Sequence, residues 1–389
     1  MITRTLSAKA KYLASKFPVV AITGPRQSGK TTLARAVFSN YDYASLEDPV
    51  ELARVLDDPK LFLIRKKGLI IDEAQRAPEI FSHIQVLVDR VNKPGRFILT
   101  GSRNIMLQKN LSQTLAGRVA LLTLLPFSIE ELSATRYAVR GVEEAMYQGF
   151  YPRIYDKKIK PLDWYPSYFN TYVERDVRDM KDIGNLAAFR KFTQMCAARI
   201  GQIVNLSSLA NDCGITHNTA KAWLSVLEAT YIIFLLQPHH KNFNKRLIKA
   251  PKLYFYDTGL ACFLLRIENK KALQTHYLRG GIFESMVISE FVKYRLHRGL
   301  PSNLYFWRDK AGAEVDCIVE TDNALIPIEI KSGTTAARDY FSGISYWKKL
   351  AGKSARKAYV IYAGQENSAW SEGELLGWRD MTDSLKRKS

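Results

Sequence analysis

The chain has 389 residues, more than one hydrophobic core usually supports, so its length predicts two or three domains. Hydrophobic residues make up 47% and charged residues 24%, which is typical of globular proteins and excludes disordered and collagen-like chains. The 57 Lys and Arg residues give a formal net charge of +19 against 38 Asp and Glu residues, which favours a polyanionic partner such as DNA.

Three further observations concern the location of the protein. Apolar runs such as residues 231–236 are far shorter than the ~20 residues that cross a bilayer, so no membrane span is expected. Residues 1–17 are basic like a transit peptide, but they continue directly into an apolar strand, and we interpret them as a structural helix. The four cysteines form no CxxC pair, which predicts reduced thiols in the cytoplasm.

A strand, a glycine-rich loop and a helix are expected in succession near the N-terminus. The apolar strand at 19–23 leads into a loop that matches the phosphate-binding pattern GxxxxGK[ST]. In such a loop, backbone N–H groups and a helix N-terminus face the phosphates of a nucleotide. We expect Lys30 to bridge the β- and γ-phosphates of ATP and Thr31 to bind Mg²⁺. The predicted ATP-binding residues are Gly24, Pro25, Arg26, Gln27, Ser28, Gly29, Lys30, Thr31 and Thr32.

Polar residues follow the later strands of this expected parallel sheet. The strand at 69–72 ends in Asp72, predicted to hold Mg²⁺, and Glu73, predicted to orient the attacking water. The strand at 96–101 is followed by Ser102, which we expect to sense the γ-phosphate from the neighbouring strand.

Arg118 precedes a further apolar strand at 119–125. A guanidinium group can stabilise the charge of a transferring phosphoryl group, so Arg118 is a candidate arginine finger. It would act in the site of a neighbouring subunit, which predicts a homo-oligomer. The alternative interpretation is an ordinary surface arginine.

Five motifs together resemble a known family. They are Gly-Pro-Arg-Gln-x-Gly-Lys-Thr-Thr-Leu, Ile-Ile-Asp-Glu-Ala-Gln, Leu-Thr-Gly-Ser, Leu-Ala-Gly-Arg and Leu-Pro-Phe-Ser-x-x-Glu. They are similar to those of bacterial and archaeal AAA+-type ATPases that carry a poorly characterised C-terminal domain. Members of that family have Gly-Gly-x-Pro in the lid, where this chain has Gly-Phe-Tyr-Pro at 149–152. The resemblance implies a nucleotide contact at Pro152, although the second glycine is replaced.

The middle of the chain predicts a winged helix-turn-helix. A short helix from Leu206, a turn at Gly214 and a second helix capped by Thr216 follow one another with apolar residues at helical spacing. A basic stretch at 239–252 suits a wing on DNA phosphates, and we interpret its two histidines as wing or surface residues. Winged helices also bind proteins, so that alternative stays open. The candidate DNA contacts are His217, Asn218, Lys221, Lys241, Lys245, Arg246 and Lys249.

The last third contains acidic residues in a nuclease-like order. Glu284 lies in an expected amphipathic helix, Asp316 in a strand, and Glu329 and Lys331 on one face of the next strand. This order resembles the PD-(D/E)XK restriction-endonuclease-like superfamily. The resemblance implies Mg²⁺ held by Glu284, Asp316 and Glu329, with Glu329 and Lys331 as catalytic residues. The alternative is an inactive fold in which Glu329 and Lys331 form a buried ion pair.

The combined hypothesis is an α/β protein with an AAA+-type P-loop parallel sheet, a winged-helix module and a restriction-endonuclease-like α/β domain. The expected activity is ATP hydrolysis coupled to DNA processing, with ATP and Mg²⁺ as cofactors and with a Mg²⁺-dependent nuclease as a further activity. One alternative is an ATP-switched regulator whose nuclease-like domain is inactive, and a third class is a protein-remodelling machine. The predicted domains are 1–135 (ATPase core), 136–190 (helical lid and linker), 191–260 (winged helix) and 261–389 (nuclease-like).

Overall fold

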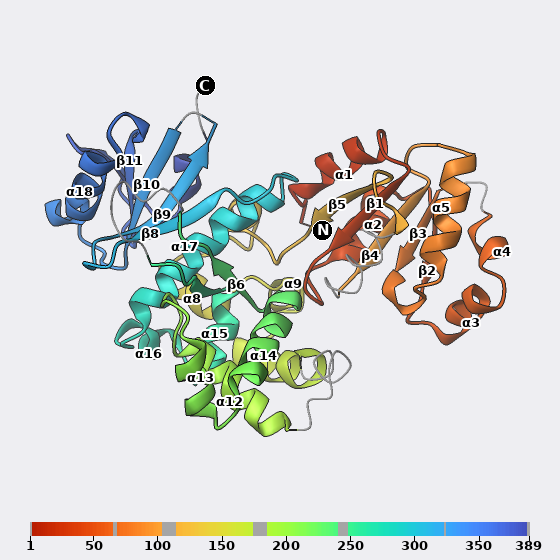
Figure 1. Ribbon diagram of the computed structural model, residues 1–389, viewed down its shortest axis with the longest axis horizontal. Helices are drawn as coiled ribbons and strands as arrows, with labels where there is room; N and C mark the ends of the chain where they lie inside the picture. The colour runs from red at the N-terminus through yellow and green to blue at the C-terminus, as the bar shows by residue number, and fades with distance from the viewer. Residues whose placement is uncertain are drawn as a thin grey trace.

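The computed structural model describes residues 2–64, 68–102, 114–173, 185–239, 248–322 and 324–386. Figure 1 shows two sheets at opposite ends of the molecule, with a helical part and the long helix α17 between them. Within these described residues, no helix is both long enough and apolar enough to cross a membrane.

The N-terminal part is a five-stranded parallel sheet of strand order β2-β3-β4-β1-β5. The central strands β1, β3 and β4 are buried along their whole length, as their continuous apolar runs predict. Because the strands are parallel, the carboxyl ends of β1, β3 and β4 lie at the same edge of the sheet. The elements are α1 (Leu6–Ala14), β1 (Val19–Thr23), α2 (Lys30–Val37), β2 (Asp42–Ser45), α3 (Pro49–Asp57), α4 (Pro59–Leu63), β3 (Leu69–Asp72), α5 (Ile80–Arg90), β4 (Phe97–Gly101) and β5 (Val119–Thr123).

Two apolar layers cover this sheet. Val19 and Ala21 of β1 belong to a core that includes residues of α5, whereas Val20 and Ile22 face the core with α1 and α2. Helix α1 buries Leu6 and Ala10 in the second layer. The interpretation of the N-terminal segment as a structural helix is therefore confirmed.

The middle of the chain is helical and carries one antiparallel β-hairpin. Helices α12, α13 and α14 precede strands β6 and β7, and an isolated bridge joins Ile203 to the start of β7. Asn205 caps α13 and Thr216 caps α14, as the sequence predicts for Thr216. The elements are α7 (Ile129–Ser133), α8 (Val142–Gln148), α9 (Pro152–Asp156), α10 (Pro161–Tyr168), α12 (Leu186–Ala197), α13 (Leu206–Cys213), α14 (His217–Ala229), β6 (Ile233–Leu236), β7 (Lys252–Phe255), α15 (Thr258–Leu264) and α16 (Lys270–Gln274).

The C-terminal part is a six-stranded mixed sheet of order β12-β13-β11-β10-β9-β8. Strands β8, β9 and β10 form an antiparallel meander, and β10 pairs in parallel with β11. Helix α18 packs against one face, where Trp347 is fully buried. The elements are α17 (Arg279–Leu296), β8 (Leu304–Arg308), β9 (Glu314–Thr321), β10 (Ala324–Lys331), α18 (Ser342–Ala351), β11 (Ala358–Tyr362), β12 (Ser368–Ala369) and β13 (Gly373–Gly377).

The hairpin of the middle part docks on the edge of the C-terminal sheet. The backbone N–H of His239 donates to the carbonyl of Phe306 in β8 at 2.7 Å, and the N–H of Ile248 donates to Arg308 at 3.1 Å. His239 is fully buried, so its interpretation as a surface residue is wrong, and His240 lies outside the described residues. A single apolar core also extends from Leu125 to Met381, which joins the three predicted domains after residue 135. Their boundaries stay a prediction.

Candidate functional site

The phosphate-binding loop connects β1 to α2 in a conformation that requires glycine. Gly24 has a φ of +145°, and a Cβ there would lie 2.1 Å from the carbonyl oxygen of Leu124. Gly29 has a φ of +94° and is followed directly by Lys30, the first residue of α2. The Lys30 ammonium donates to the carbonyls of Gly24 at 3.0 Å and Pro25 at 2.8 Å. The loop therefore curls around its own lysine, as the sequence predicts.

A hydroxyl and a carboxylate meet beside this loop. The Thr31 hydroxyl donates to Asp72 Oδ2 at 2.8 Å, and Tyr43 donates to the same oxygen at 3.0 Å. Thr100 of β4 donates to the other carboxylate oxygen. Burial and the charge of Asp72 raise the pKa of Tyr43 to about 12, so its phenol stays a donor. Hydroxyl and carboxylate oxygens suit Mg²⁺, and the buried Ser28 hydroxyl makes no hydrogen bond to any described residue, so the loop fits a nucleotide with its metal ion.

Glu73 lies immediately after β3 and is held by two side chains. Its φ of +54° places it in the left-handed region, and its Oε2 accepts from Ser102 at 2.9 Å and Gln75 at 2.5 Å. Burial alone would raise the pKa of Glu73, but the charges of Lys30 and Arg26 and these two hydrogen bonds lower it below its ordinary value. Glu73 is therefore an oriented, ionised carboxylate at the edge of the sheet that carries the loop.

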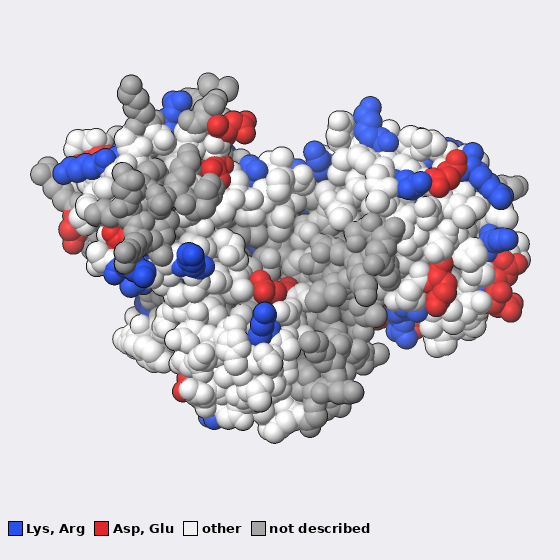
Figure 2. All heavy atoms as spheres, viewed as in Figure 1, with Lys and Arg blue, Asp and Glu red and all other residues white. Residues whose placement is uncertain are grey.

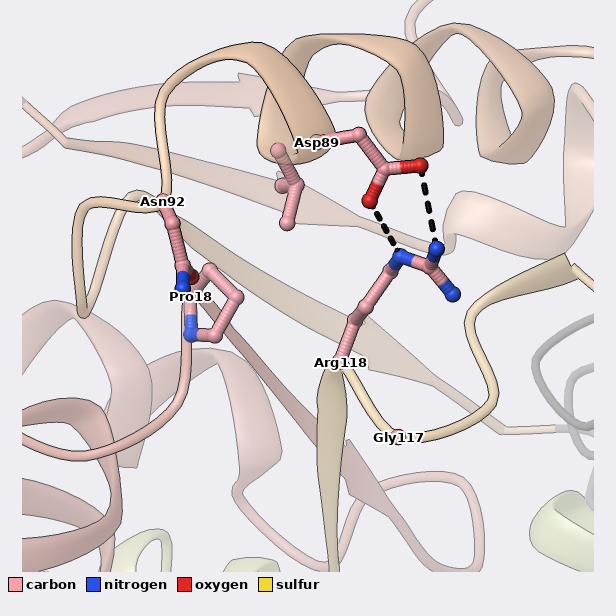
Figure 3. A pocket seen from close by; sticks show the side chains of 6 residues that line it. Pro18, Asp89, Asn92, Gly117 and Arg118 are labelled. Carbon is pink, nitrogen blue, oxygen red and sulfur yellow. Dashed lines mark hydrogen bonds and ion pairs between the residues drawn. The ribbon is translucent and has the colours of Figure 1, made fainter.

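Arg118 lies at the opposite edge of the sheet from the phosphate-binding loop. It precedes β5, whose first residue pairs with the first residue of β1, whereas the loop follows the last residue of β1. Its guanidinium donates twice to Asp89, at 2.5 and 3.0 Å, beside a pocket of about 180 Å³ (Figure 3). Arg118 therefore does not reach the nucleotide site of its own subunit, and its role in a neighbouring subunit stays a prediction.

A buried arginine that the sequence analysis did not identify, Arg4, forms hydrogen bonds with the phosphate-binding loop and with residues after β5. Arg4 donates to the carbonyl of Ser28 at 2.8 Å, to the carbonyl of Leu125 at 2.6 Å and to Glu131 at 3.1 Å. Glu131 belongs to the Ser-x-x-Glu capping box of α7, which was visible in the sequence. The partners of Arg4 lie as far as 127 residues away, so no local pattern indicates its role.

Helix α17 contacts the same support. The Nε2 atom of His297, just after α17, accepts from the N–H of Leu125 at 3.2 Å, and its Nδ1 lies 3.5 Å from Glu131. Lys293 donates to the carbonyl of Phe127 at 3.0 Å. The C-terminal half of α17 is thereby connected through Glu131 and Arg4 to the phosphate-binding loop.

The remaining predicted contacts are placed as follows. Pro152 is the first residue of α9 and is partly buried, and its contact with nucleotide stays a prediction. His217, Asn218 and Lys221 are exposed on α14, and Lys249 is exposed before β7. Lys241, Lys245 and Arg246 lie outside the described residues.

A second polar cluster lies where α17 meets the C-terminal sheet. Lys331 donates to Glu329 Oε1 at 2.7 Å, while Glu329 Oε2 is buried and makes no hydrogen bond to a described residue. Asp316 Oδ2 accepts from the N–H of Ile330 at 2.8 Å. Burial and the charges of Glu329 and Glu284 raise the pKa of Asp316 well above its ordinary value. The structure therefore brings the four nuclease-like residues of the sequence analysis together.

Lys252 of β7 lies within this cluster. Its ammonium is 2.9 Å from Glu284 Oε1, forms an ion pair with Glu314 and lies 3.9 Å from Asp316 Oδ1. Across the described part of the chain, no three His, Cys, Asp or Glu side chains form a group that could hold a metal ion. In this conformation the cluster does not fit Mg²⁺, because the carboxylates face an ammonium group instead.

Comparisons with known proteins divide the chain into three consecutive regions. An AAA domain matches residues 16–133, a domain of unknown function (DUF8612) matches 139–271, and a second domain of unknown function (DUF4143) matches 279–380. Among solved structures, the Walker-type ATPase of Pyrococcus abyssi has a TM-score of 0.49 at 15% identity, covering 69% of this chain and 96% of that protein.

Three relatives match the chain over most of their own length. The uncharacterized protein Rv2008c of Mycobacterium tuberculosis and the uncharacterized protein Mb2031c of Mycobacterium bovis are each 34% identical over 338 residues, which is 85% of this chain and 74% of each relative. The uncharacterized protein MJ1544 of Methanocaldococcus jannaschii is 23% identical and covers 80% of this chain and 74% of its own length. The chain therefore belongs to the same family as the two mycobacterial proteins, and its residues 16–133 are an AAA domain.

Proposed function

We propose that the protein binds ATP with Mg²⁺ and hydrolyses the γ-phosphate. The observation that carries this proposal is the meeting of Lys30, Thr31, Asp72 and Glu73 at one edge of the parallel sheet. Lys30 and the N–H groups of the loop would hold the phosphates, while Thr31 and Asp72 would hold Mg²⁺, which neutralises phosphate charge. Glu73, oriented by Ser102 and Gln75, would position and polarise the attacking water.

Glu73→Gln tests this proposal. The variant keeps the loop and the Mg²⁺ ligands but loses the charge that polarises water, so ATP should still bind while turnover falls by about 10²- to 10⁴-fold. Phosphate release and binding of a fluorescent ATP analogue measure the two effects. Glu79→Gln, an exposed carboxylate at the start of α5, is the matched control and should hydrolyse ATP at the unaltered rate. Wild-type turnover by the Glu73→Gln protein would contradict the assignment.

We also propose a homo-oligomer in which Arg118 enters the nucleotide site of the adjacent subunit. The position of Arg118 supports this proposal. Its side chain is only partly buried and lies away from the phosphate-binding loop of the same subunit. A mixture of Arg118→Ala and Lys30→Ala proteins should regain hydrolysis, since a mixed interface can pair an intact loop with an intact arginine. Each variant alone should be inactive, and full activity of the Arg118→Ala assembly would exclude this role.

The proposed partner is DNA, bound by the unit of α12, α13, α14, β6 and β7. The order of three helices followed by a hairpin is typical of a winged helix, whose capped third helix enters the major groove. His217, Asn218 and Lys221 are exposed on the first turns of that helix. On the face drawn in Figure 2, Lys and Arg side chains are spread over both ends of the molecule and are not gathered in one stripe. We expect the DNA contact at α14, where these three side chains are exposed.

For the C-terminal sheet, the ion pairs of Lys252 favour the alternative function, an ATP-switched DNA-binding regulator whose nuclease-like site is inactive in this conformation. The competing proposal is Mg²⁺-dependent cleavage through Asp316, Glu329 and Lys331. Incubation of labelled linear, branched and single-stranded DNA with Mg²⁺, with and without ATP, separates the two. Intact DNA throughout supports the regulator, whereas cleavage that Asp316→Ala removes supports the nuclease.

A further inference from the structure

Lys252 begins β7 and lies among carboxylates from two other elements. Glu284 comes from α17, and Glu314 and Asp316 come from β9. Only 3% of the Lys252 residue is exposed. The lysine therefore connects the hairpin of the middle part to the C-terminal sheet through buried charge, which differs from the solvated phosphate contact expected of a wing.

The position of Lys252 is fixed by the backbone on both sides of the hairpin. Its strand pairs with β6, where Leu236 is its partner, and it also forms a bridge with Ile203. Tyr254 lies on the same face of β7 and donates to the same oxygen of Glu284, at 2.5 Å. An ammonium group held in this way cannot leave the carboxylates by a simple side-chain rotation, because β7 itself directs it toward them.

The electrostatic environment keeps this lysine charged. Burial alone lowers the pKa of Lys252, but the charges of Glu284, Asp316 and Glu314 reverse the effect and raise that pKa above its ordinary value. Glu329 accepts from Lys331 through its Oε1 at 2.7 Å, and its Oε2 is buried without a hydrogen bond to a described residue. One carboxylate oxygen of Glu329 thus has no hydrogen bond to a described residue, while the Lys252 ammonium contacts oxygens of Glu284 and Glu314.

We propose that Lys252 is an inhibitory cation built into the fold, which keeps divalent metal ions away from the cluster of Glu284, Asp316 and Glu329. A divalent ion needs oxygen ligands at about 2.0–2.6 Å and cannot share them with an ammonium group already bound there. The residues involved do not belong to the nucleotide site. If this proposal fails, the proposed ATP hydrolysis is not affected. If the proposed ATP hydrolysis fails, this proposal is not affected.

The test is direct measurement of metal binding. All proteins carry Asp72→Asn, which removes the carboxylate proposed to hold Mg²⁺ beside the phosphate-binding loop, and all are free of nucleotide. Bound Mn²⁺ is measured by electron paramagnetic resonance. The key variant adds Lys252→Met with Glu314→Gln, which removes one positive and one negative charge and retains Glu284, Asp316 and Glu329. It should bind Mn²⁺ about tenfold or more tightly than the parent, because no ammonium group then competes for the oxygens of Glu284 and Asp316.

Two controls identify the site. Adding Asp316→Asn to the key variant should abolish the gained binding, and Lys310→Met, which removes an exposed lysine from the turn before β9, should leave the parent's binding unaltered. If the key variant unfolds, refolding in Mn²⁺ should recover it. Equal Mn²⁺ affinity in parent and key variant, no binding by the folded key variant, or no recovery in Mn²⁺ would each overturn the proposal.

Discussion

Lys30 and Lys252 are both almost fully buried near carboxylates, with 5% and 3% of each residue exposed, but their ammonium groups have different partners. Lys30 donates to two backbone carbonyls of its own loop. Lys252 forms ion pairs with carboxylates from α17 and β9. A phosphate can replace neutral carbonyls at little cost, whereas withdrawing Lys252 leaves buried carboxylates without a counter-charge. The first lysine is thus arranged to bind a ligand, and the second is already neutralised by the protein.

The largest expected effect is on folding stability at the second lysine. Lys252→Met should lower the free energy of unfolding by about 3–5 kcal/mol, because it removes the buried ammonium beside Glu284 and Asp316, whereas Glu314 keeps its ion pair with Arg308. Combining it with Glu314→Gln should restore part of that loss. Urea unfolding followed by circular dichroism measures both variants. A loss below about 1 kcal/mol would place Lys252 among ordinary surface ion pairs and remove the contrast between the two lysines.

The matched substitution Lys30→Met should affect ligand binding instead of folding. ATP with Mg²⁺ at about 100 times its Kd should stabilise the unsubstituted protein by about 2.7 kcal/mol, and the Lys30→Met protein should show almost none of this gain. Its stability without nucleotide should fall by less than that of the Lys252→Met protein, because Lys30 donates to two neutral carbonyls and its charge acts on one carboxylate, that of Glu73. Thermal melting with and without ATP tests both statements. An equal ATP-dependent shift in the two proteins would contradict the role of Lys30.

The difference between Lys30 and Lys252 also explains why the sequence predicts the nucleotide site but not the ion pairs of Lys252. Residues 24–32 form the loop by themselves, and the parallel sheet brings Asp72 and Glu73 to it, so strand order and motif spacing were sufficient. The partner of Lys252 in α17 is 32 residues away, and no spacing rule connects them. The sequence predicts that Lys252 belongs to a basic wing, because residues 239–252 contain no acidic residue. The edge of β8, on which the hairpin docks, is a tertiary feature that no local pattern contains.

A third buried basic group, His297, has a lowered pKa, whereas nearby carboxylates raise the pKa of Lys252. Burial lowers the pKa of His297 to about 3, and the positive charges of Arg4 and Lys293 contribute in the same direction against Glu131. The unfolded chain binds a proton at His297 near its ordinary pKa of about 6.5, whereas the folded chain does not until about pH 3. Stability is therefore complete above pH 6.5 and falls as the pH drops, with the loss ending near pH 3.

For His297 this loss should reach about 2 kcal/mol between pH 7.5 and pH 5. His297→Gln retains an acceptor for the N–H of Leu125 but cannot be protonated, so its stability should depend less on pH by that amount. Urea unfolding of both proteins at a series of pH values gives the comparison. Parallel pH profiles would show that His297 is protonated in the folded protein, contrary to its burial.

The smallest expected effect concerns an exposed lysine, which should act only through solvent-screened contact with DNA. If Lys221 neutralises one phosphate, Lys221→Ala should reduce the steepness of the dependence of log binding constant on log salt concentration by about 0.9. Lys271→Ala removes an equally solvent-facing lysine from α16 and should leave the slope unaltered. Neither substitution should change folding stability by more than about 0.5 kcal/mol, unlike Lys252→Met. Fluorescence anisotropy with labelled duplex DNA at several salt concentrations measures the slopes, and equal slopes for all three proteins would move the DNA contact away from α14.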